Sequence, residues 1–135
     1  MADTLHLVIR TPHAAVVDRS VDAARVPTRS GQLGLRPRQE PFVTVVEAGL
    51  VLLDAEGERR FAATAGGLLR TDRDLALLAT PFAVTGATGE EVMGALDAAL
   101  AAPDSELFTR RRMALLERRI VQELDPAQRG RRRDA

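Results

Sequence analysis

The side chains that could carry chemistry are few and widely spaced. The two histidines are His6, in an alternating apolar segment, and His13, beside Pro12 in a predicted turn. A metal site needs several ligands that converge on one point, and no cluster of His, Asp and Glu at ligand spacing surrounds either histidine. The chain has no cysteine, which excludes disulfides, thiolate nucleophiles and cysteine metal sites. We therefore expect neither a metal nor another cofactor.

The remaining polar clusters have structural explanations. Asp72 and Asp74 fall in a predicted turn, and Glu90 and Glu91 fall in the first turn of a predicted helix. Turn formation and the helix dipole account for carboxylates at such places. Every basic residue is arginine, so a Schiff-base lysine and a phosphate-loop lysine are also excluded. The sequence therefore predicts no catalytic residue, and no enzyme.

Composition indicates an ordinary soluble globular protein with an uneven charge distribution. The chain has 135 residues, of which 45% are hydrophobic and 28% charged, and its net charge is zero. Residues 1–103 hold 10 arginines against 13 acids, whereas residues 104–135 hold 9 arginines against 6 acids. The basic end suits either an acidic partner or a solvated helix face. With no apolar run of about 18 residues and no signal peptide, we expect a chain made and kept in the cytoplasm.

The first two thirds of the sequence read as short strands separated by turns. Residues 5–10 alternate between apolar and polar types, which is the period of a strand with one buried face. A further alternation groups Val21, Ala23 and Arg25 on one face of a strand that ends at Pro27. Residues 54–57 are predicted to form the turn of a hairpin. Eight to ten strands at this spacing favour a β-sandwich.

The pattern becomes helical after Pro81. Thr88 to Glu91 fits a capping box at the start of a first helix, and Pro103 ends that helix. A second helix is predicted over residues 107–124, with an apolar stripe of Met113, Leu116, Ile120 and Leu124. The short connection predicts an antiparallel hairpin. The fold class is therefore mainly β plus α, with a β-sandwich domain over 1–86, a helical hairpin over 87–125 and a disordered basic tail over 126–135.

Three features suggest interactions. Residues 31–41 hold two glycines, two prolines and two arginines, which indicates a fixed and presented loop or a corner of the sandwich. In the second helix, Arg111 falls beside Arg118 and Arg112 beside Arg119, flanking the face opposite the apolar stripe. The arginine-rich tail suits phosphate or acidic protein. Nucleic acid is not expected as a partner, because 3% aromatic content without Trp or Tyr removes most stacking platforms.

Several segments resemble one known family. The segment Gly31-Gln-Leu-Gly-Leu-Arg-Pro-Arg-Gln-Glu-Pro-Phe-Val-Thr44 resembles the signature G-E-L-G-I-x-P-G-H-A-P-L-L-T of ATP synthase ε subunits. Residues 5–12 are similar to the first strand of that family, residues 65–69 to its S-G-G-x-L-E segment, and residues 75–79 to its closing strand. The order of sandwich and helical hairpin is also that of the family. The resemblance covers the whole chain and is strongest over residues 5–80.

The chain departs from the family pattern at identifiable positions. Arg38 and Gln39 replace Gly and His of P-G-H-A-P, Glu40 replaces Ala, and Gln32 replaces the Glu after the first Gly. In the segment Leu96-Asp-Ala-Ala-Leu-Ala101, Leu100 stands where the ATP-binding members have arginine, so we do not expect nucleotide binding. The short hairpin and the segment 118–126 look more like the divergent N-type ATPase ε variants.

The resemblance implies a non-catalytic subunit of the central stalk that couples the γ subunit to the c-ring. The residues implied to face the c-ring are Gln32, Arg36, Arg38, Gln39 and Glu40. The hairpin is implied to inhibit ATP hydrolysis, with Arg111, Arg112, Arg118 and Arg119 meeting the β subunits transiently. Such a protein is peripheral on the cytoplasmic face of the bacterial inner membrane, without insertion into it. The alternative is a free-standing β-sandwich adaptor whose basic helix binds an acidic protein.

Overall fold

A computed structural model describes residues 3–101 of the chain. Ten strands and one helix, α1 (Gly89–Ala101), follow one another along these residues. The strands are β1 (Leu5–Arg10), β2 (Ala15–Val21), β3 (Ala23–Thr28), β4 (Gly31–Leu35), β5 (Gln39–Val46), β6 (Gly49–Ala55), β7 (Glu58–Thr64), β8 (Gly67–Arg73), β9 (Leu75–Ala79) and β10 (Ala83–Gly86).

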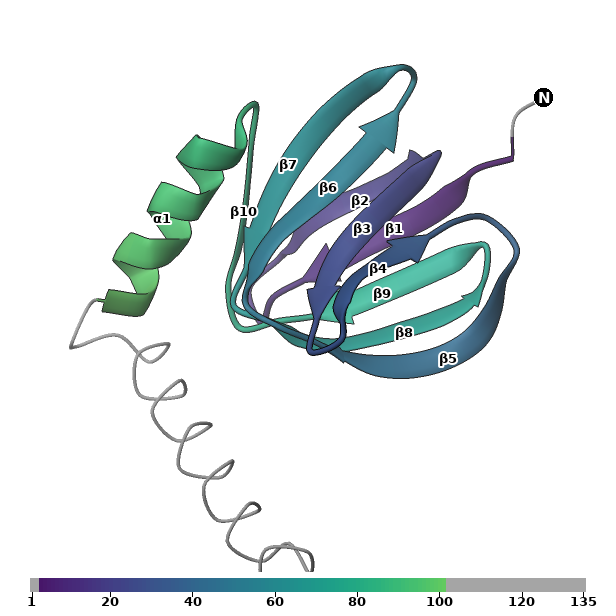
Figure 1. The fold of residues 1–135 in the computed structure, drawn as a ribbon, viewed down its shortest axis with the longest axis horizontal. Helices are drawn as coiled ribbons and strands as arrows, with labels where there is room; N and C mark the ends of the chain where they lie inside the picture. The colour runs from purple at the N-terminus through teal and green to yellow at the C-terminus, as the bar shows by residue number, and fades with distance from the viewer. Residues whose placement is uncertain (1–2, 102–135) are drawn as a thin grey trace, which may run out of the picture. The chain divides into compact units, whose positions relative to one another are not determined.

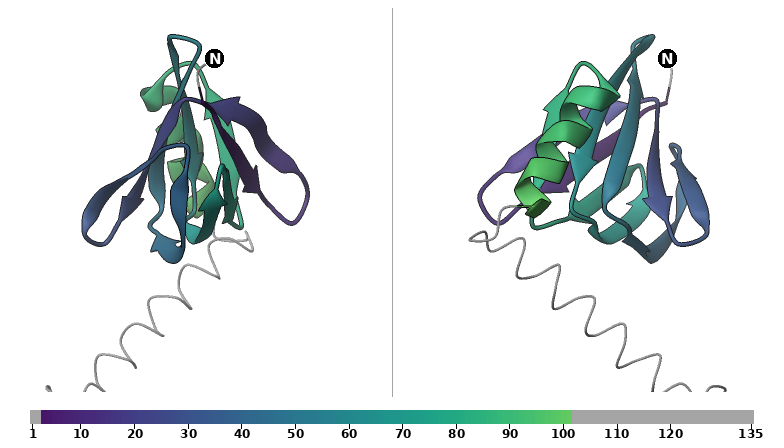
Figure 2. Two further views of the ribbon diagram at one scale, coloured as in Figure 1. Left: turned by 90° about the vertical axis from the view of Figure 1, so that its right-hand side faces the viewer. Right: turned by 60° about the vertical axis from the view of Figure 1, so that its left-hand side comes forward.

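The strands form two five-stranded sheets that face each other. The first has the order β2-β1-β9-β8-β5 and the second the order β10-β7-β6-β3-β4. The only parallel pairing among the described strands joins β1 to β9, and the others are antiparallel. The views in Figure 1 and Figure 2 show the two layers, with β4 and β5 at one side and β2 and β10 at the other. The predicted β-sandwich is confirmed.

The core lies between the two inner faces. In β1, the alternating residues Leu5, Leu7 and Ile9 are fully buried, whereas His6 and Arg10 are exposed. The second sheet contributes Val51 and Leu53 of β6 to the same cluster. Full burial of a Val, Leu or Ile side chain contributes about 1.5–3 kcal/mol. The period-two pattern read from the sequence is therefore the pattern of burial.

The β6–β7 hairpin has the tight turn that residues 54–57 predicted. β6 and β7 pair as far as Ala55 opposite Glu58, which leaves two residues in the turn. These residues, Glu56 and Gly57, have φ of 54° and 77°. Two left-handed residues in succession define the type I′ turn, whose twist matches that of the flanking strands.

The alternation predicted for residues 21–26 was wrong, because the pattern of buried residues does not continue unbroken from β2 into β3. Val21 is buried at the end of β2, but the buried residues of β3 are Ala24 and Val26, not Ala23 and Arg25. The reason is a change of sheet at Asp22, which shifts the alternation by one residue. The Asp22 N–H donates to the Asp54 carbonyl at 2.7 Å, and its carboxylate accepts the Glu56 N–H at 3.1 Å. The β6–β7 hairpin thus holds this corner.

The predicted loop over residues 31–41 is also corrected. Residues 31–35 form β4 and β5 begins at Gln39, so only residues 36–38 connect the strands. Glycine and proline made the segment look irregular, yet Gly34 fits a strand and Pro41 occupies an irregularity in the pairing of β5 with β8. Proline is tolerated at such bulges and on edge strands because no ladder hydrogen bond is lost there. β10, which follows Pro81, was not predicted at all.

The first helix of the predicted hairpin is confirmed. The Glu91 N–H donates to Thr88 Oγ1 at 3.2 Å, as expected for an N-cap. Val92 and Leu96 are almost fully buried. A Cβ placed on Gly89 would lie 3.5–3.6 Å from side-chain atoms of Leu50 and Phe61, so the helix begins against the outer face of β6 and β7. The second predicted helix and the tail lie outside the described residues.

Gly67 should tolerate no side chain. A Cβ there would lie 1.9 Å from the Ala79 carbonyl oxygen, a backbone atom of the paired strand, whereas a Cβ on Gly34 would meet nothing within 4 Å. We predict that Gly67→Ala destabilises the fold by about 2–3 kcal/mol and lowers Tm by roughly 10 °C. The matched Gly34→Ala variant should stay within about 0.5 kcal/mol of the native chain. Thermal and urea unfolding measure both, and equal stabilities would contradict the packing described.

Candidate functional site

An exposed apolar patch covers part of the outer face of the first sheet. Its members are Val43, Val45, Leu68 and Leu75, whose exposed fractions are 60%, 55%, 53% and 41%. Single exposed apolar side chains are ordinary, but a contiguous group of them is typical of an interaction surface. These four residues are called the apolar patch below.

Strand register brings Val43, Val45 and Leu68 together, whereas Leu75 pairs with Asp72 at the other end of β9. Val45 of β5 lies opposite Leu68 of β8, and Val43 lies opposite Arg70. The same register continues into β9, where Leu77 pairs with Arg70. Because alternate residues point to one face, these side chains project outward while Val46 and Leu69 fill the core. The patch therefore rests on regular, paired strands, which limits its movement.

A polar frame borders the patch on β1 and β2. His6 pairs in register with Leu75 of β9, and its Nε2 lies 2.5 Å from Asp18 Oδ1. Both side chains are exposed. Arg70 and Asp72 of β8 are also exposed on this face. The surface thus mixes apolar and charged side chains, as is common at protein interfaces: Arg70 lies between Val43 and Leu77, and His6 and Asp72 lie on either side of Leu75.

The β4–β5 turn is held by hydrogen bonds from within the chain. Arg38 has φ of 61°, in the left-handed region that non-glycine residues rarely occupy. Its N–H donates to Asp74 Oδ1 at 2.8 Å, and its guanidinium donates to Asp3 Oδ2 at 2.5 Å. Glycine adopts such a φ without strain, which explains the glycine of the family pattern at this position. Here Asp74 supports the same conformation in an arginine.

Gln39 and Glu40 also contribute to the turn and to the bulge that follows it. Gln39 Oε1 accepts the Arg36 N–H at 3.2 Å. The Thr71 hydroxyl donates to the Glu40 carbonyl at 3.1 Å and accepts the Phe42 N–H at 3.2 Å. Thr71 is only 2% exposed, so these bonds replace the ladder bonds that the irregular pairing removes. The side chains of Arg36 and Glu40 remain exposed.

Gln32 lies at the other end of β4 from this turn. It pairs with Pro27 next to the β3–β4 turn, and four residues of strand place it roughly 13 Å from Arg36. Gln32 and Arg36 nevertheless line one shallow hollow of about 310 Å³ on the outer side of β3, β4 and β6, together with Arg25 and Asp54. The five residues predicted to face the c-ring thus do not form one loop.

Asp54 at the edge of this hollow is held in its charged form. Arg59 Nε donates to one carboxylate oxygen at 2.8 Å and a terminal nitrogen donates to the other at 3.3 Å. These hydrogen bonds from Arg59, with a smaller contribution from Arg25, lower the pKa of Asp54, and the pair raises the pKa of Arg59. The contribution to stability is present at neutral pH and is lost as acid protonates Asp54. Exposed pairs of this kind contribute little to stability, because water screens them.

The residues predicted in the second helix cannot be placed. Arg111, Arg112, Arg118 and Arg119, and the stripe of Met113, Leu116, Ile120 and Leu124, lie outside the described residues. The apolar patch, in contrast, was missed by the sequence analysis. The signal for two of its members was the run of β-branched and apolar residues over 42–46, which reads equally well as a strand buried on both faces.

The described part of the chain holds no group of three or more residues that could bind a metal ion. His13 is exposed in the β1–β2 turn, and its N–H donates to Thr11 Oγ1 at 3.2 Å. Within residues 3–101, no helix reaches the length and apolarity that a membrane span requires.

Comparison with known sequences agrees with this architecture. The family model for "ATP synthase, Delta/Epsilon chain, beta-sandwich domain" matches residues 4–86. The ATP synthase epsilon chain of Chloroflexus aggregans is 35% identical over 65 residues, covering 48% of this chain and 47% of that one. The epsilon chain of Myxococcus xanthus is 33% identical over 91 residues, covering 67% and 66%. The match spans about half the length of several of these curated relatives.

Solved structures show the same fold at low identity. A chain in the Euglena gracilis mitochondrial ATP synthase, in a structure of its OSCP, F1 and c-ring, superposes with a TM-score of 0.59 at 20% identity, covering 84% of this chain and 76% of that one. A chain from the central stalk and c-ring of the Tetrahymena thermophila mitochondrial ATP synthase gives a TM-score of 0.51 at 12% identity, covering 58% and 64%.

Proposed function

Because this chain belongs to the ATP synthase delta/epsilon chain family, we propose that it is the ε subunit in the central stalk of a rotary F-type ATP synthase. It has no catalytic role there and joins the γ subunit to the c-ring. The observation that carries the proposal is an exposed apolar patch on a rigid sandwich of that family. The complex places the subunit on the cytoplasmic face of a bacterial plasma membrane as a peripheral component.

The γ subunit occupies the apolar patch. Full burial of a Val or Leu side chain contributes about 1.5–3 kcal/mol, so covering four half-exposed side chains supplies several kcal/mol. The charged side chains of Arg70, within the patch, and of His6 and Asp18, beside it, then set the register of the contact, because misplaced charges at an interface are strongly disfavoured. A regular sheet transmits torque better than a mobile loop, since its backbone hydrogen bonds resist shear.

The c-ring contacts the Gln32 end of β4. The turn at the opposite end uses Arg38 and Gln39 for hydrogen bonds within the chain, so these two residues shape the turn. Gln32 is exposed, and its side chain makes no hydrogen bond to the rest of residues 3–101. Its carboxamide is therefore free to bind a polar loop of another subunit, although the family signature has Glu at this position.

Residues 87–125 regulate ATP hydrolysis. The support for this part of the proposal is the sequence: Arg111, Arg112, Arg118 and Arg119 flank one helix face, and the stripe of Met113, Leu116, Ile120 and Leu124 gives the hairpin a packing face. Arginine binds carboxylates with two parallel hydrogen bonds, so acidic segments of the β subunits are the expected contacts. Such contacts resist rotation of the stalk.

Charge placed in the apolar patch should abolish binding to γ. We predict that Val45→Asp or Leu68→Asp weakens co-elution with the γ subunit of the same genome at least about tenfold, because an interface then buries an unpaired carboxylate. Both positions are exposed, so unfolding midpoints should barely change. Ala14→Asp, at an exposed turn residue, is the matched control. Native-like binding by both patch variants would contradict a γ contact at the patch. No binding by the native chain would contradict the ε assignment and would favour the alternative of a free-standing adaptor.

Cysteine cross-linking locates the c-ring contact, since the native chain has no cysteine. We predict that Gln32→Cys forms a disulfide with a single cysteine in the cytoplasmic loop of the c subunit, and that Gln39→Cys does not. A disulfide requires Cα atoms within about 7 Å. Cross-linking therefore distinguishes a contact at Gln32 from a contact at Gln39. Mild oxidation of the assembled complex, followed by non-reducing electrophoresis, gives the answer. Cross-linking only from Gln39→Cys would place the other end of β4 on the ring.

Removal of residues 104–135 tests the regulatory role. We predict that the assembled complex then hydrolyses ATP faster, while the truncated chain still co-elutes with γ because the apolar patch is unchanged. Steady-state hydrolysis by matched amounts of complex measures the effect. An unchanged rate would rule out inhibition by this segment.

A further inference from the structure

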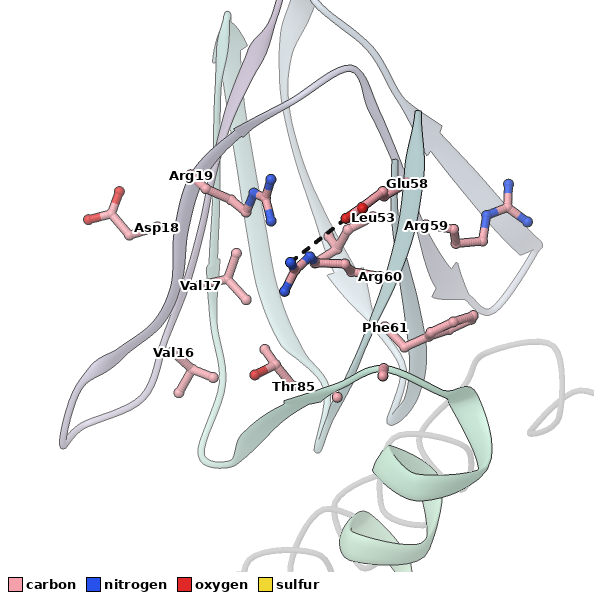
Figure 3. Close-up of a pocket in the computed structure, with 12 residues that line it drawn as sticks. Val16, Val17, Asp18, Arg19, Leu53, Glu58, Arg59, Arg60, Phe61 and Thr85 are labelled. Atoms are coloured by element: carbon pink, nitrogen blue, oxygen red, sulfur yellow. Dashed lines mark ion pairs between the residues drawn. The ribbon is translucent and has the colours of Figure 1, made fainter. Parts of the chain in front are cut away.

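A groove opens between the two sheets on the side away from the apolar patch. Its volume is about 610 Å³, and the residues that matter most in its lining are Val17, Arg19, Leu53, Glu58, Arg60 and Thr85. It lies where β2 ends one sheet and β10 ends the other. Figure 3 shows the Arg19 and Arg60 side chains entering this space from β2 and β7.

Arg19 occupies an inward-facing position that the core would otherwise fill. It lies between Val17 and Val21, which are 4% and 1% exposed on the same face of β2, and it pairs in register with buried Leu7. On the opposite wall, Arg60 pairs with buried Leu53. Folding alone favours apolar side chains at such positions. Two arginines that face one space from different sheets point instead to a ligand.

Of the arginines that line the groove, Arg19 is the one without an anionic partner among residues 3–101. Arg60 lies 3.8 Å from Glu58, Arg59 pairs with Asp54 on the outer face, and Asp18 pairs with His6 on the other outer face. No carboxylate within residues 3–101 lies within 4 Å of the half-buried Arg19 guanidinium. A guanidinium that is partly removed from water gains from an anionic partner.

We infer that this groove binds an extended acidic peptide segment of a partner protein, with a carboxylate held between Arg19 and Arg60. The volume lies in the range of sites for organic ligands and exceeds what a single small anion fills. Val16, Val17 and Phe61 supply apolar wall, which suits the neighbouring side chains of a peptide. β2 and β10 are edge strands, and edge strands offer free backbone groups to an added strand.

The groove and the apolar patch share no residue. β2 and β5 are the two opposite edges of the first sheet, and no patch residue lines the groove. Asp18, which the proposed function places beside the γ contact, also lines the groove, so the two surfaces adjoin at β2, but the inference does not rest on the function proposed above.

Titration of the ¹⁵N-labelled full chain with the peptide acetyl-Val-Glu-Val-Glu-Val-amide tests the inference. We expect saturable shifts of amides in β2 and β7, and binding at least about tenfold weaker for the matched peptide with Gln in place of Glu. Arg19→Leu should lose binding by a similar factor and should fold, because its neighbours on the face are apolar. Arg29→Leu, at an exposed turn outside the groove, should bind like the native chain.

Defined outcomes would overturn the inference. No saturable shift up to several millimolar peptide, or equal binding of the Gln peptide, would do so. Inorganic phosphate that saturates the same amides at lower concentration than the peptide would make this a small-anion site instead. If Arg19→Leu does not fold, Arg60→Ala at the exposed wall gives the same test. Val45→Asp should leave peptide binding unchanged, which separates this inference from the γ contact.

Discussion

The contact between the two inner faces of the sandwich is the interaction on which the other features depend. Leu5, Leu7 and Ile9 of β1 pack with Val51 and Leu53 of β6 in one buried cluster. Because a strand sends alternate residues to opposite sides, this core also decides which residues must face outward. The surfaces available for partners are therefore the outer faces, the turns and the open edges between the sheets.

Those surfaces differ in how firmly the fold holds them. The apolar patch rests on paired strands, and the β4–β5 turn is fixed by Asp74 and Thr71 through hydrogen bonds to the backbone. The groove beside β2 has a buried apolar floor at Val17 and Leu53 and charged walls. A rigid scaffold thus presents one apolar surface and one basic groove on different sides, which suits a protein that joins several partners.

Local patterns were enough to predict much of the fold. The alternation of residues 5–10, the hairpin turn within residues 54–57 and the cap at Thr88 depend on neighbours in sequence, and each was found, with the turn narrowed to Glu56 and Gly57. The turn at Arg38 shows that a sequence motif does not by itself predict the backbone conformation at a position where the chain departs from it. Arg38 stands where the family signature has glycine, and it adopts a left-handed conformation in which its N–H donates to Asp74, 36 residues away.

The sequence by itself determined the strand-rich class, the first helix, the absence of cysteine chemistry and the family. The tertiary structure alone decided the change of sheet at Asp22, the exposure of Val43 and Val45, and the inward position of Arg19. Alternation divides a strand into two faces, but it does not say which face meets the other sheet. That choice depends on pairing between distant strands, and no local pattern records it.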